Sequence, residues 1–401
     1  MKREKKYFAG GMLAGCLTGL LVPVLVVGLI MLFLGGSLKG QDNVDEEELY
    51  YRQLESKLAE IQACIDENYV FEYDRAELTD MLFRGYVAGL GDPYSTYYTA
   101  KEYAETMEAA SGEYYGIGVL VSQDPGSYAI SVVNVFKNSP AMEAGLQIGD
   151  VLIAVEGEDI TAMALDAVVP LIKGEEGSFV SITVYRPESR QELTLPVERR
   201  RVEVDTVSCR MLDETTGYLA LIEFDSVSPN QVRSAIGELT AGGMERLILD
   251  LRDNPGGLLD SVLAIADFFL EKDALIFYME DKQGREYRFN AKEEALFSGE
   301  LIVLINGNSA SAAEVLSGAL KDHDRATLMG ETSFGKGIVQ SYLELSDGSA
   351  LKLTTEHYCT PDGSDIHGRG IEPHIEGRDD PATRESDELL EAALAYWKNE
   401  A

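Results

Sequence analysis

A serine and a lysine, 25 residues apart and each set among small residues, are the side chains best suited to covalent chemistry. Ser311 lies in the stretch NGNSASAAEV, and Lys336 lies in the stretch SFGKGIVQS. A serine hydroxyl attacks a carbonyl carbon only when a neighbouring base takes its proton. A lysine amine can be that base only when an apolar setting keeps it neutral. The pair therefore predicts a hydrolytic site with Ser311 as nucleophile and Lys336 as general base.

Each of these residues also has a purely structural interpretation. Ser311 and Glu314 have the S-x-x-E spacing of a helix capping box, which requires no chemistry. Lys336 could be an exposed loop residue in front of the strand IVQSYLEL. Because alternate residues share one face of a strand, Lys336 and Gln340 are expected to point the same way. Gln340 would then orient the neutral amine towards Ser311.

The stretch RDNPGG at residues 252–257 links a buried strand to a helix. Consecutive glycines before a helix leave backbone N–H groups free to hold a developing oxyanion. The candidate donors are Gly256 or Gly257, together with Ala312 beside the candidate nucleophile. DNPGG is similar to the GNSGG of trypsin-like serine proteases, but Pro255 occupies the nucleophile's position. A Ser/His/Asp site is not expected, because no recognisable catalytic context surrounds any of the histidines: His323, His357, His367 and His374.

Residues 112–200 have the pattern of a small β-rich domain. The strand-like runs YYGIGVLVS and YAISVVNVF precede a short helix with a glycine turn, the helix LDAVVPLIKG and the strand SFVSITVYR. This order resembles a PDZ domain in the arrangement found in bacterial proteases. Glycines let backbone N–H groups converge on a peptide carboxylate, and the next strand offers an edge for peptide addition. The candidate peptide-binding residues are Gly116, Ile117, Gly118 and Val119.

The remaining periodicities define three other folded regions. Apolar residues at steps of three and four predict helices over residues 49–111, which could mediate pairing of subunits. Alternating strands and helices over residues 201–376 predict an α/β core with a partly parallel sheet. An amphipathic C-terminal helix is expected within residues 377–401. The predicted fold class is therefore a multidomain protein that combines α/β and α+β parts.

The N-terminus reads as a membrane anchor. Residues 8–36 contain no charged side chain and are long enough to cross a bilayer as a helix. The basic stub at residues 1–7 is expected to stay cytoplasmic, which places the body outside the cytoplasm at the cell membrane. Residues 37–48 form an acidic linker. A cleaved signal peptide is the alternative, although its apolar core is usually about 7–15 residues.

Charge and cysteine content exclude several functional classes. The net charge is −35, and because residues 1–36 contribute +3, the remaining body carries −38. Such a body is not expected to bind nucleic acid or anionic lipid. The three cysteines beyond the anchor suit neither a disulfide framework nor a metal site, and they are expected to be small buried residues: Cys64, Cys209 and Cys359.

Several motifs together resemble the carboxy-terminal processing peptidases, also called tail-specific proteases, over about four-fifths of the chain. They are GDPYSTYY, LDLRDNPGG, NGNSASAAE, GETSFGKGIVQ, DGSALKLT and the ending YCTPDG…GRGIEP. The resemblance implies Ser311 as nucleophile, Lys336 as general base and Gln340 as its orienting partner. It also implies an anchored protease outside the cytoplasm that needs no metal or cofactor, cuts protein substrates recognised by their C-termini, and has a crotonase-type core.

Two other functions are compatible with parts of the sequence. A catalytically silent scaffold would keep the PDZ module for peptide binding, although the intact set of Ser311, Lys336 and Gln340 argues against it. An enoyl-CoA-hydratase-like enzyme would also build oxyanion donors from glycine-rich loops between strands and helices. The sequence offers no convincing acyl-carrier site, and a peptide-binding module suits proteolysis better.

Overall fold

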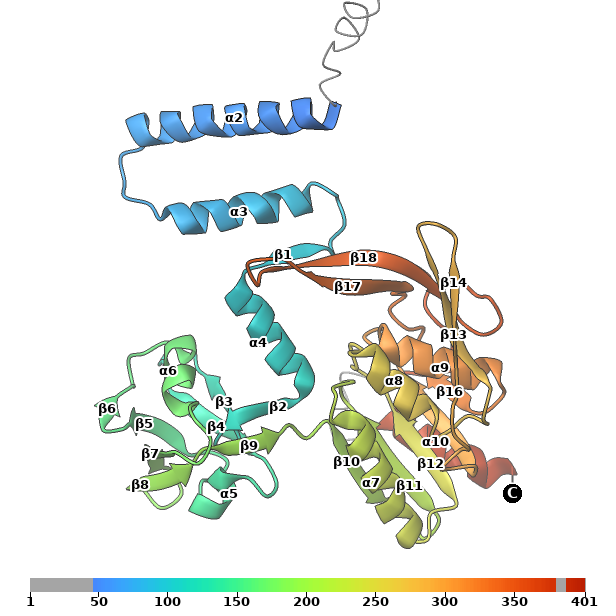
Figure 1. The fold of residues 1–401 in the computed structure, drawn as a ribbon. Helices are drawn as coiled ribbons and strands as arrows, with labels where there is room; N and C mark the ends of the chain where they lie inside the picture. Colours follow the sequence, from blue (N-terminus) through green and yellow to red (C-terminus); the bar gives the residue numbers. More distant parts are fainter. Residues whose placement is uncertain (1–45, 380–386, 401) are drawn as a thin grey trace, which may run out of the picture. The chain divides into compact units, whose positions relative to one another are not determined.

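The computed structural model describes residues 46–379 and 387–400 (Figure 1). The predicted cytoplasmic stub, the predicted membrane segment and most of the predicted linker lie outside these residues. The linker was expected to reach residue 48, but helix α2 already begins at Glu46, where three acidic residues favour the first helical turn. Within the described ranges, no helix is both long and apolar enough to span a bilayer.

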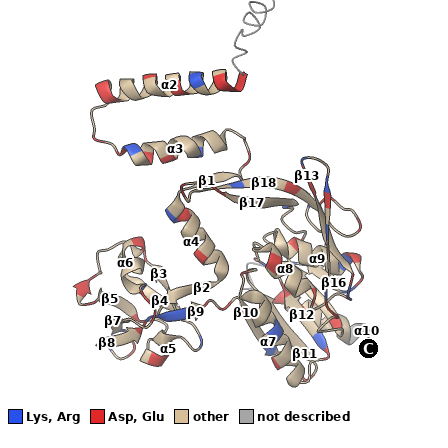
Figure 2. Cartoon of the chain, viewed as in Figure 1, with Lys and Arg blue, Asp and Glu red and all other residues tan. Residues whose placement is uncertain are grey.

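Two helices open the described chain, α2 (Glu46–Asn68) and α3 (Arg75–Ala88). The first compact unit ends at Leu78, inside α3. In this unit Asp66 accepts hydrogen bonds from Tyr73 and Arg75 and so fixes the turn between the helices. Figure 2 shows acidic residues at both ends of α2, and α2 has no buried residue. Pairing of subunits through these helices stays a prediction.

Helix α4 (Ala100–Ser111) follows Thr99, as the sequence predicts. Thr99 and Glu102 form a capping box, which satisfies two backbone N–H groups at the helix start. The helix ends at Gly112, whose φ of 68° favours glycine. A Cβ at Gly112 would lie 2.7 Å from Cγ2 of Val227, so close packing also requires glycine there.

The β-rich domain contains a sheet with the order β3-β4-β5-β7-β8, and β6 pairs with β5. Its strands are β3 (Val119–Gln123), β4 (Ile130–Val135), β5 (Val151–Val155), β6 (Glu158–Asp159), β7 (Phe179–Arg186) and β8 (Gln191–Glu198). Its helices are α5 (Pro140–Ala144) and α6 (Leu165–Ile172). Alternate residues of β7 are buried in a core of Ile and Val side chains.

A separate two-stranded pair, β2 (Glu113–Gly116) with β9 (Arg200–Glu203), closes this domain where the chain enters and leaves it. Strand β9 extends three residues past residue 200, the predicted end of this domain. The run YYGIGVLVS is also two strands rather than one, because residues 117 and 118 lie between β2 and β3.

The second large sheet has the order β10-β11-β12-β15-β16-β19. Its strands are β10 (Val207–Met211), β11 (Thr216–Leu221), β12 (Arg246–Asp250), β15 (Glu300–Ile305), β16 (Thr327–Gly330) and β19 (Ile375–Glu376). All neighbours from β11 to β19 are parallel, and only β10 is antiparallel. This confirms the predicted partly parallel α/β core, whereas its likeness to a crotonase-type fold stays a prediction.

Helices cover both faces of this sheet (Figure 1). One face packs against α7 (Ser228–Ala241), α8 (Leu259–Ala266) and α9 (Ala312–Asp322). The other face packs against α10 (Glu388–Glu400), the predicted C-terminal helix. Strand β15 shows the alternation: Leu301 and Val303 face the three helices, while Ile302 faces α10.

An antiparallel sheet of five strands completes the core: β1 (Thr96–Tyr98), β18 (Ala350–Cys359), β13 (Leu275–Asp281), β14 (Glu286–Asn290) and β17 (Ile338–Glu344). Strand β18 is its centre, because it pairs with β1, β13 and β17. The sequence motif GDPYSTYY therefore leads into a strand that lies next to β18.

Two expectations about individual residues are wrong. Cys64 is exposed, and Cys209 and Cys359 are half-buried rather than buried. Cys64 lies on α2, which buries none of its residues. The apolar run LLDSVLAIADFFLE predicts a helix to about residue 271, but α8 ends at Ala266, and Phe268 and Phe269 then turn into the core.

Candidate active site

Ser311 lies at a strained turn between β15 and α9. Its φ of 55° and ψ of −116° are unusual for a residue with a side chain. Its backbone is held on both sides: the N–H donates to Glu314 Oε2 at 2.9 Å, and the carbonyl accepts from the Tyr358 hydroxyl at 3.2 Å. Such over-determined strain is typical of functional turns, and it leaves the Ser311 side chain partly exposed.

The helix cap does not use the Ser311 hydroxyl. The Ser311–Glu314 pair has the layout of a capping box, but α9 has no side-chain hydrogen bond at its N-cap. Instead, the Glu314 N–H donates to the Ser311 carbonyl oxygen at 2.8 Å. The capping box therefore explains the hydrogen bonds of the Ser311 backbone and of Glu314. It does not use the Ser311 hydroxyl, which stays available to react.

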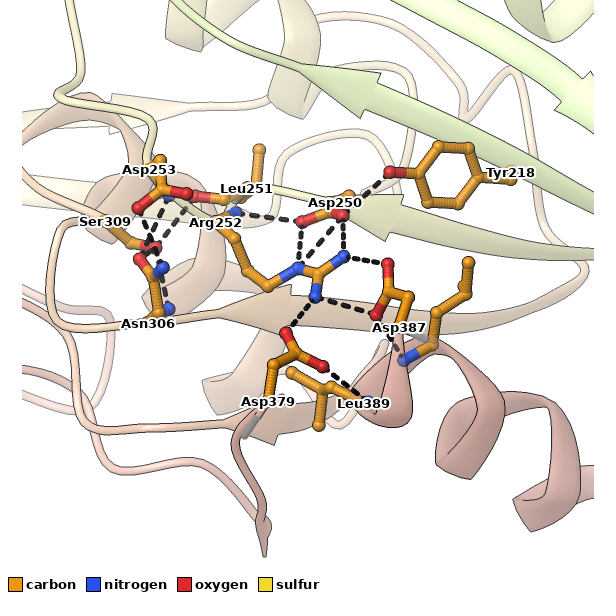
Figure 3. Close-up of polar contacts among 11 residues, drawn as sticks. Tyr218, Asp250, Leu251, Arg252, Asp253, Asn306, Ser309, Asp379, Asp387 and Leu389 are labelled. Atoms are coloured by element: carbon orange, nitrogen blue, oxygen red, sulfur yellow. Dashed lines mark hydrogen bonds and ion pairs between the residues drawn. The ribbon is translucent and has the colours of Figure 1, made fainter. Parts of the chain in front are cut away.

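Ser309, two residues before Ser311 in the same loop, is fully buried, and its hydroxyl bonds to the backbone (Figure 3). Its Oγ donates to the Leu251 carbonyl at 2.7 Å and accepts from the Asn306 N–H at 3.0 Å. Asn306 also pairs with Asp253, so this serine helps join the loop after β12 to the loop after β15. These bonds leave Ser311 as the serine suited to be the nucleophile.

Glu314 links the nucleophile to the candidate base, a role that the sequence did not predict. Its carboxylate is fully buried. Oε2 accepts from the Ser311 N–H at 2.9 Å and from the Lys336 N–H at 2.8 Å. Oε1 accepts from the Gly335 N–H at 2.7 Å and from the Ser333 hydroxyl at 2.5 Å. One carboxylate therefore holds the backbones of both candidate residues, Ser311 and Lys336, and the S-x-x-E spacing is its only local signal in the sequence.

The RDNPGG loop at residues 252–257, the candidate oxyanion loop, packs directly against the turn at Ser311. An ideal Cβ on Gly256 would lie 2.8 Å from Ser311 Cβ and 2.9 Å from the Ala312 nitrogen. The Gly256 N–H is already used, since it donates to Asn254 Oδ1 at 2.8 Å. Among the described residues, the Gly257 and Ala312 N–H groups have no hydrogen-bond acceptor. Of the two predicted glycines, Gly257 is therefore the better oxyanion donor.

Asn254 sets this geometry from a fully buried position. Its Nδ2 donates to the Leu221 carbonyl at 2.8 Å, and its own carbonyl accepts from the Ala310 N–H at 2.9 Å. Because its Oδ1 also holds Gly256, one side chain ties the oxyanion loop to β11 and to the nucleophile turn.

Lys336 is half-buried on the loop before β17. Burial, followed by the nearby Lys352 ammonium, lowers the pKa of Lys336, while Glu314 and Asp92 oppose that shift. This direction suits a general base. The amine lies over the ring of Tyr94, with Nζ 5.1 Å from the ring centroid. In the described part of the chain, no hydrogen bond joins Lys336 Nζ to Ser311.

Gln340 does not contact Lys336 in the way that strand alternation suggested. Strand β17 begins at Ile338, so the alternation rule does not reach Lys336. The Gln340 amide donates weakly to the Thr354 hydroxyl at 3.4 Å, and that hydroxyl donates to Asp92 Oδ2 at 2.7 Å. The amide therefore belongs to a polar network that begins in the GDPYSTYY loop.

A half-buried arginine, Arg252, joins the loop at residues 252–257 to the C-terminal segment (Figure 3). The Arg252 guanidinium forms ion pairs with Asp250, Asp379 and Asp387, which lie 2.6–2.8 Å away. Burial alone would lower the pKa of Arg252, but hydrogen bonds from its guanidinium to Asp250 and Asp387 raise it. The Tyr218 hydroxyl donates to Asp250 at 2.8 Å and completes the network.

Among the described residues, no hydrogen bond joins a histidine to Ser311. His323 Nε2 lies 2.7 Å from the Leu275 carbonyl, and His374 Nδ1 accepts from the Leu328 N–H at 2.9 Å. The rings of His357 and His367 contact each other. Within residues 46–379 and 387–400, no cluster of three or more His, Cys, Asp and Glu side chains has the arrangement of a metal site.

The predicted peptide-binding loop joins β2 to β3. Ile117 is buried in the domain core, and its carbonyl accepts from the Ala141 N–H at 2.8 Å. Gly118, with a φ of 83°, points its N–H towards the Tyr114 hydroxyl, and so does Val119. Burial raises the pKa of Tyr114 to about 12, against these two hydrogen bonds. A peptide carboxylate bound at this loop would therefore have to replace the Tyr114 hydroxyl oxygen as the acceptor of the Gly118 and Val119 N–H groups.

Comparisons with known proteins support these assignments at the level of family. Residues 215–377 match Peptidase family S41, and residues 131–186 match the PDZ domain family. A "Probable CtpA-like serine protease" of Staphylococcus haemolyticus is 35% identical over 325 residues, which cover 80% of this chain. The chain spans only 64% of that relative's length.

Two further relatives carry names that refer to C-terminal processing. The "Carboxy-terminal processing protease CtpA" of Bacillus subtilis is 32% identical over 357 residues, which cover 88% of this chain and 75% of that protein. The solved "photosystem II D1 C-terminal processing protease" is 30% identical and covers 77% of this chain and 84% of its own, with a TM-score of 0.47. By its sequence, this chain belongs to the carboxy-terminal processing proteases of peptidase family S41, with a PDZ domain.

Proposed function

We propose that the chain is a serine endopeptidase in which Ser311 is the nucleophile and Lys336 the general base. The observation that carries this proposal is the Glu314 carboxylate, which holds the backbones of both residues. The half-burial and lowered pKa of Lys336 support the second role, because only a neutral amine can accept the serine proton. The unused N–H groups of Gly257 and Ala312 support an oxyanion site beside the nucleophile.

The reaction would proceed through an acyl-enzyme. Ser311 Oγ attacks the scissile carbonyl carbon while Lys336 Nζ takes the hydroxyl proton, and the oxyanion is held by the N–H groups of Gly257 and Ala312. The tetrahedral intermediate collapses, the C–N bond breaks, and Lys336 returns the proton to the leaving amine. Lys336 then takes a proton from a water molecule, whose oxygen attacks the ester carbonyl carbon. As the C–O bond to Ser311 breaks, Lys336 returns that proton to Ser311 Oγ, which restores the free enzyme. Gln340 is proposed to orient the amine once it has turned towards the serine.

Substrates would be protein chains recognised by their C-terminal tails. Strand β3 is at the edge of its sheet, so its outer side can receive a peptide strand. The Gln123 side chain ties the end of β3 to the start of α6, since it bonds to the backbones of Met163 and Leu165. A groove between β3 and α6 would hold the tail, with its carboxylate at Gly118 and Val119.

We expect amidation of a peptide's C-terminus to lower kcat/KM by about ten- to a hundredfold, because hydrogen bonds to a charged group contribute about 1.5–3 kcal/mol. Cleavage of free and amidated peptides would be followed by mass spectrometry, with Ser311→Ala as the inactive control. Tyr114→Phe keeps the ring but frees the two N–H groups, so it should widen the difference between the two peptides. Equal cleavage of both peptides would remove tail recognition and leave the peptidase assignment intact.

We further propose that residues 8–36 anchor the protein in the cell membrane with the catalytic body outside the cytoplasm. The basis is the uncharged length of this segment and the basic residues in front of it. The full chain should stay in the membrane fraction after an alkaline carbonate wash, and a chain lacking residues 8–36 should not. A mature protein that begins after this segment and is soluble would show a cleaved signal peptide instead.

A further inference from the structure

The loop formed by GDPYSTYY, residues 91–98, is fixed against the core beside the candidate base. Asp92 accepts from the Tyr94 N–H at 2.9 Å and from the Ser95 hydroxyl at 2.5 Å, which shapes the turn. The Ser95 hydroxyl accepts from the Thr354 N–H at 3.1 Å, and the Thr354 hydroxyl donates to Asp92. Strand β1 then pairs with β18. These bonds give Tyr94 a defined place.

Tyr94 presents its ring to the Lys336 amine. The distance of 5.1 Å from Nζ to the ring centroid lies within the range of a cation–π contact. The ring attracts an ammonium group through its quadrupole but gains little from a neutral amine. The contact therefore favours the protonated form of Lys336, which is the form that cannot act as a base.

The charged groups around the amine divide into two sets. The Lys352 ammonium on β18 and the burial of the site both disfavour a charged Lys336 amine and lower its pKa. Glu314 on α9 and Asp92 in the loop favour the ammonium form. Burial alone would raise the pKa of Asp92, but its hydrogen bonds from Ser95 and Thr354 lower it, with a smaller effect of His367 in the same direction. Asp92 is therefore a carboxylate near neutral pH, and the ring acts together with Glu314 and Asp92 against the lowering of the Lys336 pKa.

We infer that Tyr94 is a positioning residue that holds the Lys336 ammonium at its ring face, away from Ser311, until the amine loses its proton. The inference rests on the proposed function, because it takes Lys336 to be the base. The ring would act as a resting site: deprotonation weakens the contact and frees the amine to turn to the serine hydroxyl. This assigns a role to Tyr94 in the motif GDPYSTYY, which the proposed reaction does not otherwise use.

The first test measures the pKa of Lys336 without any catalysis. In a Ser311→Ala background, trace acetic anhydride would label lysines across a pH series, and mass spectrometry would quantify the Lys336 peptide against exposed Lys282. Tyr94→Leu, which removes the ring, should lower the pKa of Lys336 by about 0.5–1 unit. Tyr94→Phe, which keeps the ring face, should leave that pKa nearly unchanged.

Three outcomes would overturn the inference: an unchanged pKa in Tyr94→Leu, a raised pKa in Tyr94→Leu, or an equal shift in Tyr94→Phe. Melting curves would verify that each variant folds, and Tyr94→Met is the substitute if the leucine variant does not. Because this readout follows only the amine, it remains valid even if the chain has no peptidase activity.

The second test uses the active serine and separates the inference from the proposed function. Labelling of Ser311 by a fluorophosphonate should rise with pH as Lys336 becomes neutral, and Tyr94→Leu should move that rise to lower pH by the same shift. If the Lys336 pKa moves while the labelling curve does not, Lys336 is not the base and the proposed mechanism fails. The contact between Tyr94 and Lys336 would still stand in that case.

Discussion

Ser311→Ala is expected to lower turnover by several orders of magnitude and to leave melting almost unchanged, because it removes only a hydroxyl that has no structural hydrogen bond at the N-cap. Ser309→Ala is expected to do the reverse. It would leave the Asn306 N–H without its acceptor and remove the shorter of the two hydrogen bonds to the Leu251 carbonyl, at a cost of about 1–3 kcal/mol. Peptide cleavage and thermal melting of both variants would be measured side by side.

Ser311→Gly is the matched control for this pair. Glycine lacks the nucleophile but adopts a positive φ without strain, so this variant should be inactive and should melt above Ser311→Ala. An active Ser311→Ala beside an inactive Ser309→Ala, both melting like the parent, would reverse the assignment. A glycine variant that melts below the alanine variant would show that the turn at Ser311 is not strained.

The parts of the fold that could be predicted from the sequence are those specified within a few residues. The cap at Thr99 and the start of α9 after Ser311 both follow from side chains three residues apart. The buried strand β12 and the glycines after it likewise have local signatures. Strands β13 and β14 were not predicted as a hairpin, and their place beside β18 depends on a partner more than 70 residues away.

The candidate site was predictable in its residue types and only partly in its geometry. The sequence indicates Ser311 and Lys336, but it cannot show that Asn254 uses the Gly256 N–H and leaves that of Gly257 free. The position of Tyr94 at the Lys336 amine is equally hidden, because 242 residues separate the two in the chain. Contacts of this kind arise from tertiary packing, which local patterns do not encode.

Glu314 is the clearest case of a residue whose tertiary contacts cannot be predicted from the local sequence. Its S-x-x-E spacing with Ser311 predicts a helix cap, and that prediction accounts for one of its four hydrogen bonds. The other three come from residues 333–336, on a different loop. A residue with the sequence pattern of an ordinary helix cap is therefore the physical link between the proposed nucleophile, Ser311, and the proposed base, Lys336.

Glu314→Gln is therefore expected to reduce both activity and stability. Each carboxylate oxygen accepts two hydrogen bonds, Oε1 from the Gly335 loop and Oε2 from Ser311 and Lys336. A glutamine places an NH2 group on one side, where it faces two donors instead of accepting from them. We expect a loss of about 2–5 kcal/mol of stability and a fall in kcat of at least about a hundredfold, because the catalytic backbones would separate.

The matched control is Glu271→Gln, the same change of side chain at an exposed glutamate outside the site. It should leave both melting and turnover within error of the parent, so any loss in Glu314→Gln comes from the buried position and not from one lost charge. Glu314→Asp adds a second comparison: it keeps the charge but shortens the reach, and it should recover part of the stability and little of the turnover. If Glu314→Gln folds and cleaves peptides like the parent, Ser311 and Lys336 do not depend on a shared carboxylate, and the observation that carries the proposed dyad would lose its force.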